Sequence, residues 1–222
     1  MVGRLVVAYA WARPELVRDV EYACLSSLKW YRDERLKLQR IALDLEITPS
    51  RLIGAAAILS PLQNWDDLVK DRLYDWARAA IQGVPLEKNP HGGTTRANSE
   101  KAREWLTAPH HGSHLGLFGK GLKVRAFYAA LMGDESSVVV DRWTARVCGW
   151  APEAITKRRY RMIEEAHYSA AAALGVAPCD LQARLWVWLR DYRKGILPQW
   201  EGTEFFDNDG HGVEQRPCEE FA

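Results

Sequence analysis

The sequence predicts an all-α protein. Apolar residues recur at three- and four-residue spacing along most of the chain, which is the period of one helix face. Prolines and glycines stand at the ends of these segments, where helices begin and end. No segment shows the sustained apolar and polar alternation of a half-buried strand. With 222 residues, 47% of them hydrophobic, and ten tryptophans, the chain can bury one sizeable core.

The clearest helices are expected in the first half of the chain. Residues 12–46 predict one or two amphipathic helices. Residues 48–61, "TPSRLIGAAAILSP", begin with Thr48 as an N-cap and are apolar almost all round, so this helix is predicted to be central and buried. Residues 64–81 begin at Asn64 as a cap and repeat apolar residues on one face: Leu68, Val69, Leu73, Trp76 and Ala80.

A loop and further helices are expected in the second half. Residues 83–98 are rich in Gly, Pro, Asn and Thr and predict a loop, which a short helix follows. The valines 138–140 predict a brief extended segment, and residues 141–150 a helix of about two turns. Residues 152–175 and 178–195 each begin at a proline and end at a glycine, and both are predicted to be helices.

Composition favours a soluble, cytoplasmic protein. No apolar run approaches the length of a membrane span, and the first residues lack the features of a signal peptide. The four cysteines lie far apart, which favours reduced, buried thiols over an iron–sulfur cluster or a structural zinc. They are Cys24, Cys148, Cys179 and Cys218.

Charge is divided unevenly along the chain. Residues 199–222 hold seven acidic residues against Arg216 alone, a net charge of −6, so that residues 1–198 carry +7. We therefore expect a single helical domain over 1–198 and an acidic tail over 199–222. A basic body suits a polyanionic partner.

A glycine hairpin precedes one of the predicted helices. In "GKGLKV", residues 119–124, Gly119 and Gly121 allow a tight turn and leave backbone N–H groups uncovered at a helix N-terminus. Such a turn grips a phosphate without reading sequence. Lys123 follows in the first turn of that helix, and Asp141 stands eighteen positions later at a predicted N-cap. If the two helices pack together, both side chains face one cleft.

These residues carry a resemblance to a known family. The stretch "LFGKGLKVRAFYAALMGDESSVVVDRWTARVCG" resembles the helix-hairpin-helix DNA glycosylase superfamily of the endonuclease III type. The residues in register with that pattern are Gly119, Gly121, Lys123, Val140, Asp141, Arg146 and Val147. The resemblance implies that Lys123 is the Schiff-base lysine of a bifunctional glycosylase and AP lyase, and that Asp141 is the catalytic aspartate. The "VVVDRW" link and the closing "LQARLWVWLR" are also similar to short bacteriophage glycosylase-like proteins, some of them linked to modified thymine bases.

The same resemblance implies an architecture and a partner. It predicts two helical lobes, one over about 48–150 and one from 1–47 plus 151–198, with a DNA-binding cleft between them. The partner is double-stranded DNA with a damaged or modified base, and neither a membrane nor an obligatory protein partner is expected. No cofactor or metal is expected, since the cluster cysteines of endonuclease III are absent.

Further residues are expected to contact DNA. Gln63 or Asn64 lies where the family fills the hole left by a flipped base. Arg142 and Trp143 replace the usual Thr-His, and this departure leaves the target base open. Expected backbone or groove contacts are Gly119, Lys120, Gly121 and Arg146. Lys120 or Arg125 is expected to supply positive charge that favours a neutral, nucleophilic Lys123.

Other interpretations remain open at this stage. Asp141 as only an N-cap and Lys123 as only a solvated or phosphate-binding lysine are alternatives. His110, His111 and His114 are expected to form a loop near DNA phosphates, because no carboxylate or cysteine accompanies them as a metal ligand. A non-excising protein that binds modified bases, or an enzyme of viral DNA base hypermodification, would use the same motif.

Overall fold

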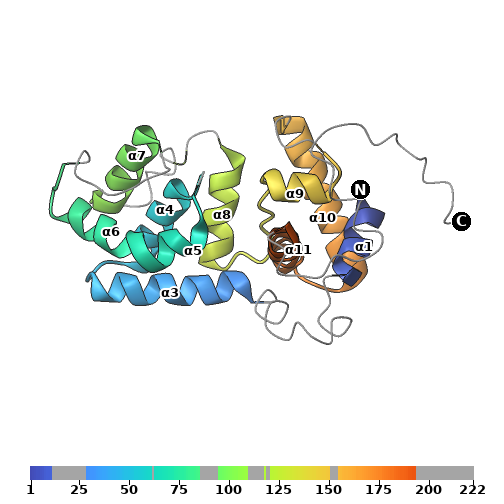
Figure 1. The fold of residues 1–222 in the computed structure, drawn as a ribbon, viewed down its shortest axis with the longest axis horizontal. Helices are drawn as coiled ribbons and strands as arrows, with labels where there is room; N and C mark the ends of the chain where they lie inside the picture. The colour runs from blue at the N-terminus through green and yellow to red at the C-terminus, as the bar shows by residue number, and fades with distance from the viewer. Residues whose placement is uncertain are drawn as a thin grey trace, which may run out of the picture.

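The structure is a computed structural model that describes residues 1–11, 29–61, 63–85, 95–109, 118, 121–150 and 155–193. In these residues the chain forms helices and connecting turns and no strand, which confirms the all-α fold class. The helices make two groups that lie side by side (Figure 1). None of the described helices is both long enough and apolar enough to cross a membrane.

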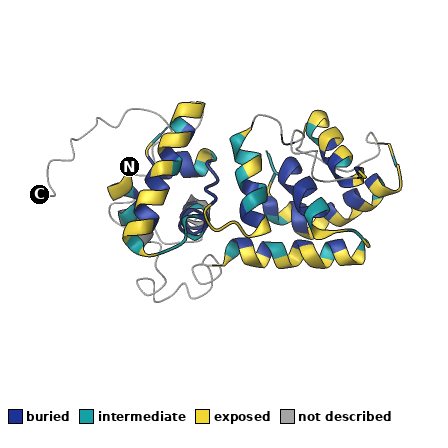
Figure 2. Ribbon diagram, turned by 180° about the vertical axis from the view of Figure 1, so that it is seen from behind, coloured by how far each residue is buried: buried dark blue, intermediate teal, exposed yellow. Residues whose placement is uncertain are grey.

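The first group is built around α4 (Pro49–Leu59). It also contains α3 (Trp30–Asp44), α5 (Trp65–Asp67), the π-helical turn Leu68–Arg72, α6 (Leu73–Ile81), α7 (Arg96–Thr107) and α8 (Leu122–Met132). Every residue from Leu52 to Leu59 is buried, as the sequence predicted for a central helix. Helices α3, α7 and α8 pack against α4. In Figure 2 the outer face of α3 is largely exposed, whereas α4, which packs against its inner face, is largely buried.

The second group contains α1 (Val2–Trp11), α9 (Arg142–Val147), α10 (Lys157–Leu174) and α11 (Pro178–Arg193). Its core includes Leu5, Ile163 and Leu185 from three of these helices. The segment between α8 and α9 crosses from one group to the other (Figure 1). Its valines are buried and form no strand in the described part of the chain.

Two elements contribute to both cores. Val139 packs in the first core, whereas its neighbours Val138 and Val140 pack in the second. Helix α11 behaves in the same way, because Ala183 belongs to the first core and Leu185 to the second. The predicted lobe limits stay a prediction, but α3, which lies within the 1–47 expected for the other lobe, packs in the first core.

Several predicted helix limits are confirmed and two are wrong. Asn64 caps α5, with its side-chain oxygen accepting from the Asp66 backbone N–H, and Gly175 ends α10 in the left-handed conformation. The loop predicted over 83–98 is too long, because Thr95 caps a helix that begins at Arg96. The helix predicted from Pro152 begins at Lys157, because the Thr156 side chain accepts the Arg159 N–H.

The contact between α4 and α7 leaves no room for a side chain at Gly54. A Cβ at this position would overlap the indole of Trp105, which is buried. We expect Gly54→Ala to lower the free energy of unfolding by about 1–3 kcal/mol, measured by urea denaturation. Gly3→Ala is the control, since nothing lies within 4 Å of a Cβ there. Equal stability of the two variants would contradict this packing.

A fully buried histidine makes the second core sensitive to acid. His167 Nδ1 lies 2.8 Å from the Ile163 carbonyl oxygen, and Nε2 has no partner among the described residues. Burial lowers the pKa of His167 from 6.5 to about 4. The unfolded chain therefore binds this proton at a higher pH than the folded protein does.

It follows that the stability from a neutral His167 is present above about pH 6.5 and is lost as the pH falls toward 4. We expect the free energy of unfolding to fall by up to about 3 kcal/mol over this range. His167→Gln removes the titrating group, and urea denaturation at several pH values should then show a shallower decline. If the free energy of unfolding of the variant falls with pH as steeply as that of the wild type, other groups cause the acid sensitivity.

Candidate functional site

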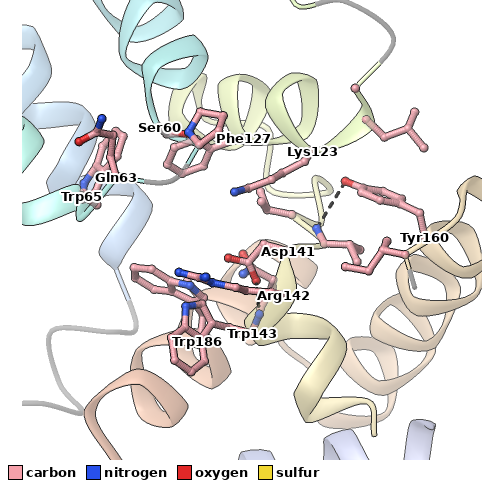
Figure 3. Close-up of a pocket in the computed structure, with 18 of the residues that line it drawn as sticks. Ser60, Gln63, Trp65, Lys123, Phe127, Asp141, Arg142, Trp143, Tyr160 and Trp186 are labelled. Atoms are coloured by element: carbon pink, nitrogen blue, oxygen red, sulfur yellow. Dashed lines mark hydrogen bonds between the residues drawn. The ribbon is translucent and has the colours of Figure 1, made fainter. Parts of the chain in front are cut away.

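Lys123 and Asp141 line one pocket between the two helical groups. The pocket has a volume of about 520 Å³ and takes residues from α3, α5, α8, α9, α10 and α11. In Figure 3 the Lys123 side chain reaches into this space from α8, and the Asp141 carboxylate faces it from the start of α9. Among the described residues, no ion pair of 4.0 Å or less joins the two. The space between them is open to a ligand.

Helix α8 positions Lys123 at its first turn. Gly121 is the N-cap and also lines the pocket, so the uncovered N-terminus of α8 lies at the pocket wall. Buried Phe127 and Leu131 anchor the helix in the first core, and Gly133, in the left-handed conformation, ends it. The lysine is therefore half-buried on a rigid element.

Asp141 is the N-cap of α9, as predicted. Its Oδ1 atom accepts the backbone N–H groups of Trp143 and Thr144, both at 2.9 Å, and lies 3.2 Å from the Thr144 hydroxyl. Within the described part of the chain, Oδ2 has no hydrogen-bond partner. One oxygen thus holds the helix while the other remains available, so the N-cap role and a chemical role are compatible.

Aromatic rings form a wall of the pocket. Trp30 is the centre of this cluster, with ring centroids 5.3 Å from Trp186, 5.8 Å from Trp65 and 6.2 Å from Phe127. The rings of Trp65 and Phe127 meet edge to face at 4.9 Å. Because the rings come from α3, α5, α8 and α11, they also join the two helical groups. A planar, apolar ligand surface suits such a wall.

Several polar side chains of the pocket already have partners. Tyr160 donates to the Val138 carbonyl at 3.1 Å and accepts from the Val140 N–H at 3.4 Å, a bond drawn in Figure 3. Burial raises the pKa of Tyr160 well above its usual value, so the phenol stays protonated. Ser60 donates to the Ala57 carbonyl. These groups hold the backbone of the pocket, and their polar atoms are already engaged.

The pocket is positively charged. Lys123, Arg142 and Lys157 line it against the single carboxylate of Asp141. The Arg142 and Arg146 guanidinium carbons lie 5.7 Å and 5.0 Å from the ring centroid of Trp143. A cationic rim with aromatic faces fits an anionic ligand that carries a ring.

The structure places most of the residues predicted from the sequence. Gln63, Arg142 and Trp143 line the pocket, whereas Asn64 caps α5 and does not. The Arg146 guanidinium lies over the Trp143 ring, and Arg146 does not line the pocket. Gly119, Lys120, the His110, His111 and His114 triplet, and the acidic tail 199–222 lie outside the described residues.

Sequence reasoning missed the aromatic wall. Trp186 on α11 lines the pocket, whereas Trp188, two residues later, is buried in the second core. Tyr31, Tyr160 and Gln182 were not singled out at all. The periodicity of a helix does not indicate which distant helices pack together. The local sequence therefore could not identify these residues as pocket residues.

The described residues contain no group of three or more side chains able to hold a metal ion. Cys148 and Cys179 are free and buried, as expected. Burial raises the pKa of each thiol to about 12, so neither is a reactive thiolate near neutral pH. Cys24 and Cys218 lie outside the described residues.

The helix-capping role of Asp141 can be separated from its free oxygen. Asn caps a helix about as well as Asp, so we expect the free energy of unfolding of Asp141→Asn to lie within about 0.5 kcal/mol of the wild-type value. In Asp141→Ala the free energy of unfolding should fall by about 1 kcal/mol. Urea denaturation measures both. An Asn variant as unstable as the Ala variant would mean that the charge itself holds α9.

Comparison with known proteins places the chain in a family but adds no activity. No curated protein and no solved structure matches the chain. One family model matches residues 21–193, which include every described pocket residue, and its description is a family of unknown function, DUF7178. The chain therefore belongs to the DUF7178 family.

Proposed function

We propose that this protein is a DNA glycosylase with AP lyase activity, which flips a damaged or modified base out of the duplex and excises it. The observation that carries the proposal is that Lys123 and Asp141 line one aromatic-walled, positively charged pocket. The resemblance of residues 117–149 to helix-hairpin-helix glycosylases supports the same roles for these two residues.

The pocket has the components that base extrusion requires. Unstacking a base costs a few kcal/mol, and stacking on aromatic side chains contributes about 1–3 kcal/mol per base. The cluster around Trp30 supplies such faces. Gln63, Arg142 and Trp143 fill or flank the gap in the duplex, and the sequence motif Gly119, Lys120 and Gly121 contacts the phosphate backbone.

Lys123 and Asp141 carry out the excision in this proposal. Neutral Lys123 Nζ attacks sugar C1′ and forms a C–N bond while the bond from C1′ to the base breaks and its electron pair leaves with the base. Asp141 Oδ2 stabilises the positive charge that develops on the sugar and accepts the ammonium proton. The C1′–O4′ bond then breaks as O4′ takes up that proton from Asp141, and the lysine nitrogen and C1′ form a protonated imine. This imine makes the C2′ proton acidic. Its removal breaks the C3′–O bond and cuts the strand.

Borohydride trapping tests this proposal. Duplexes with uracil, 5-hydroxymethyluracil, thymine glycol, 8-oxoguanine or an abasic site are incubated with protein and reductant, and covalent complexes are counted on denaturing gels. We expect a trapped complex with at least one duplex, its loss in Lys123→Gln, and a rate at least about 100-fold lower in Asp141→Asn.

Lys157→Gln is the matched control, because Lys157 lines the same pocket. This variant should still form the trapped complex, at a somewhat lower yield because the pocket loses one positive charge. A complex that survives Lys123→Gln and disappears in Lys157→Gln would reassign the nucleophile. DNA binding without a trapped complex or base release on any duplex would contradict excision and favour a protein that binds modified bases or acts in base hypermodification.

A further inference from the structure

Three buried side chains connect α3 to the carboxylate of Asp141. Tyr31 on α3 donates its phenol proton to Gln182 Oε1 on α11 at 2.6 Å. Gln182 Nε2 donates to the Thr144 hydroxyl on α9 at 3.4 Å. That hydroxyl lies 2.9 Å from the Val139 carbonyl and 3.2 Å from Asp141 Oδ1. The chain of contacts thus starts in the first helical group and ends on the carboxylate.

Donors and acceptors along this chain have a consistent direction. Burial raises the pKa of Tyr31 well above its usual value, so its phenol is a donor near neutral pH. Because the Gln182 side-chain oxygen accepts this hydrogen bond, it faces Tyr31, and the amide nitrogen faces Thr144. The Thr144 hydroxyl accepts from Gln182, and its single proton serves Val139 or Asp141.

These groups are deeply buried. Tyr31 is 6% exposed, and Gln182 and Thr144 are each 3% exposed. A buried polar group without a partner costs about 1–3 kcal/mol, so each member of the chain depends on the next. Since the backbone N–H groups of Trp143 and Thr144 already complete the N-cap, the side-chain network does more than cap α9.

We propose that Tyr31, Gln182 and Thr144 are positioning residues for Asp141. They hold Oδ1 of Asp141 in place, so that Oδ2 points into the pocket. The orientation of the carboxylate therefore depends on the packing of α3 against α11. The inference deepens the proposed function and rests on it for its catalytic consequence.

The first measurement needs no substrate. Hydrogen exchange at the Trp143 and Thr144 backbone N–H groups reports how firmly Oδ1 is held. We expect exchange about tenfold faster in Gln182→Leu, Thr144→Val and Tyr31→Phe, with recovery in Thr144→Ser, which keeps the hydroxyl. Tyr128→Phe is the control, since Tyr128 packs on Trp105 and Phe118 and does not line the pocket. Wild-type exchange in all three folded variants would overturn the proposal.

The second measurement is single-turnover cleavage of a duplex with an abasic site. We expect the rate to fall about tenfold in the same three variants and to recover in Thr144→Ser. The Kd for a duplex with a tetrahydrofuran abasic analogue should change less than about twofold, because the polar atoms that are removed bond one another and Thr144. An unchanged cleavage rate, or a loss explained entirely by Kd, would overturn the positioning role.

The two measurements separate this inference from the proposed function. If wild-type protein neither releases a base nor cuts the abasic duplex, the proposed function fails, and exchange at Trp143 and Thr144 still decides whether the network holds Asp141. If the wild type cuts DNA and the three network variants cut it at the same rate, the proposed function stands and the positioning role fails.

Discussion

Helix α11 packs in two cores at once, and the geometry of the pocket depends on this. Ala183 faces the first core and Leu185 the second, and between them in sequence Arg184 is also buried. The valines of the crossing segment divide in the same manner, Val139 to one core and Val140 to the other. Because protein interiors are close-packed, these shared elements restrict how the two helical groups move relative to each other. Lys123 from one group and Asp141 from the other are held across the pocket as a result.

The chemistry of the pocket follows from how its polar groups are used. Tyr160 and Ser60 are engaged with backbone carbonyls, and Oδ1 of Asp141 is engaged with the start of α9. The groups left to meet a ligand are cationic side chains, one carboxylate oxygen and aromatic faces. Such a set recognises shape, stacking and negative charge better than a hydrogen-bonding pattern. Under the proposed function, the choice of target base then depends on how rings and Gln63 fit the extruded nucleotide.

Much of the helical framework was predictable because its signals are local. The all-round apolar character of 52–59 indicated a central helix, and the Asn64 cap fixed the start of α5. The same local physics explains the two errors, since each lies at a threonine cap. Thr95 lay within the predicted loop, and Thr156 lay within the predicted helix. The sequence also indicated that Lys123 and Asp141 could face one cleft if their helices pack together, and both line the pocket. Their chemical roles stay a prediction.

The remainder of the site was not predictable, because it arises from contacts between distant segments. Trp30 and Trp186 stand far apart in sequence and meet only when α3 packs on α11. Tyr31 and Gln182 are 151 positions apart, and neither carries a motif. The choice between Gln63 and Asn64 also needed the structure, which assigns Asn64 to a helix cap and Gln63 to the pocket.

The most direct test of the central claim is a crystal structure of the protein with a duplex that carries a tetrahydrofuran abasic analogue. We predict that the analogue's sugar is rotated out of the duplex and lies between Lys123 Nζ and Asp141 Oδ2, with the start of α8 against the phosphates. A sugar that remains within the duplex while the pocket stays away from the DNA would contradict it.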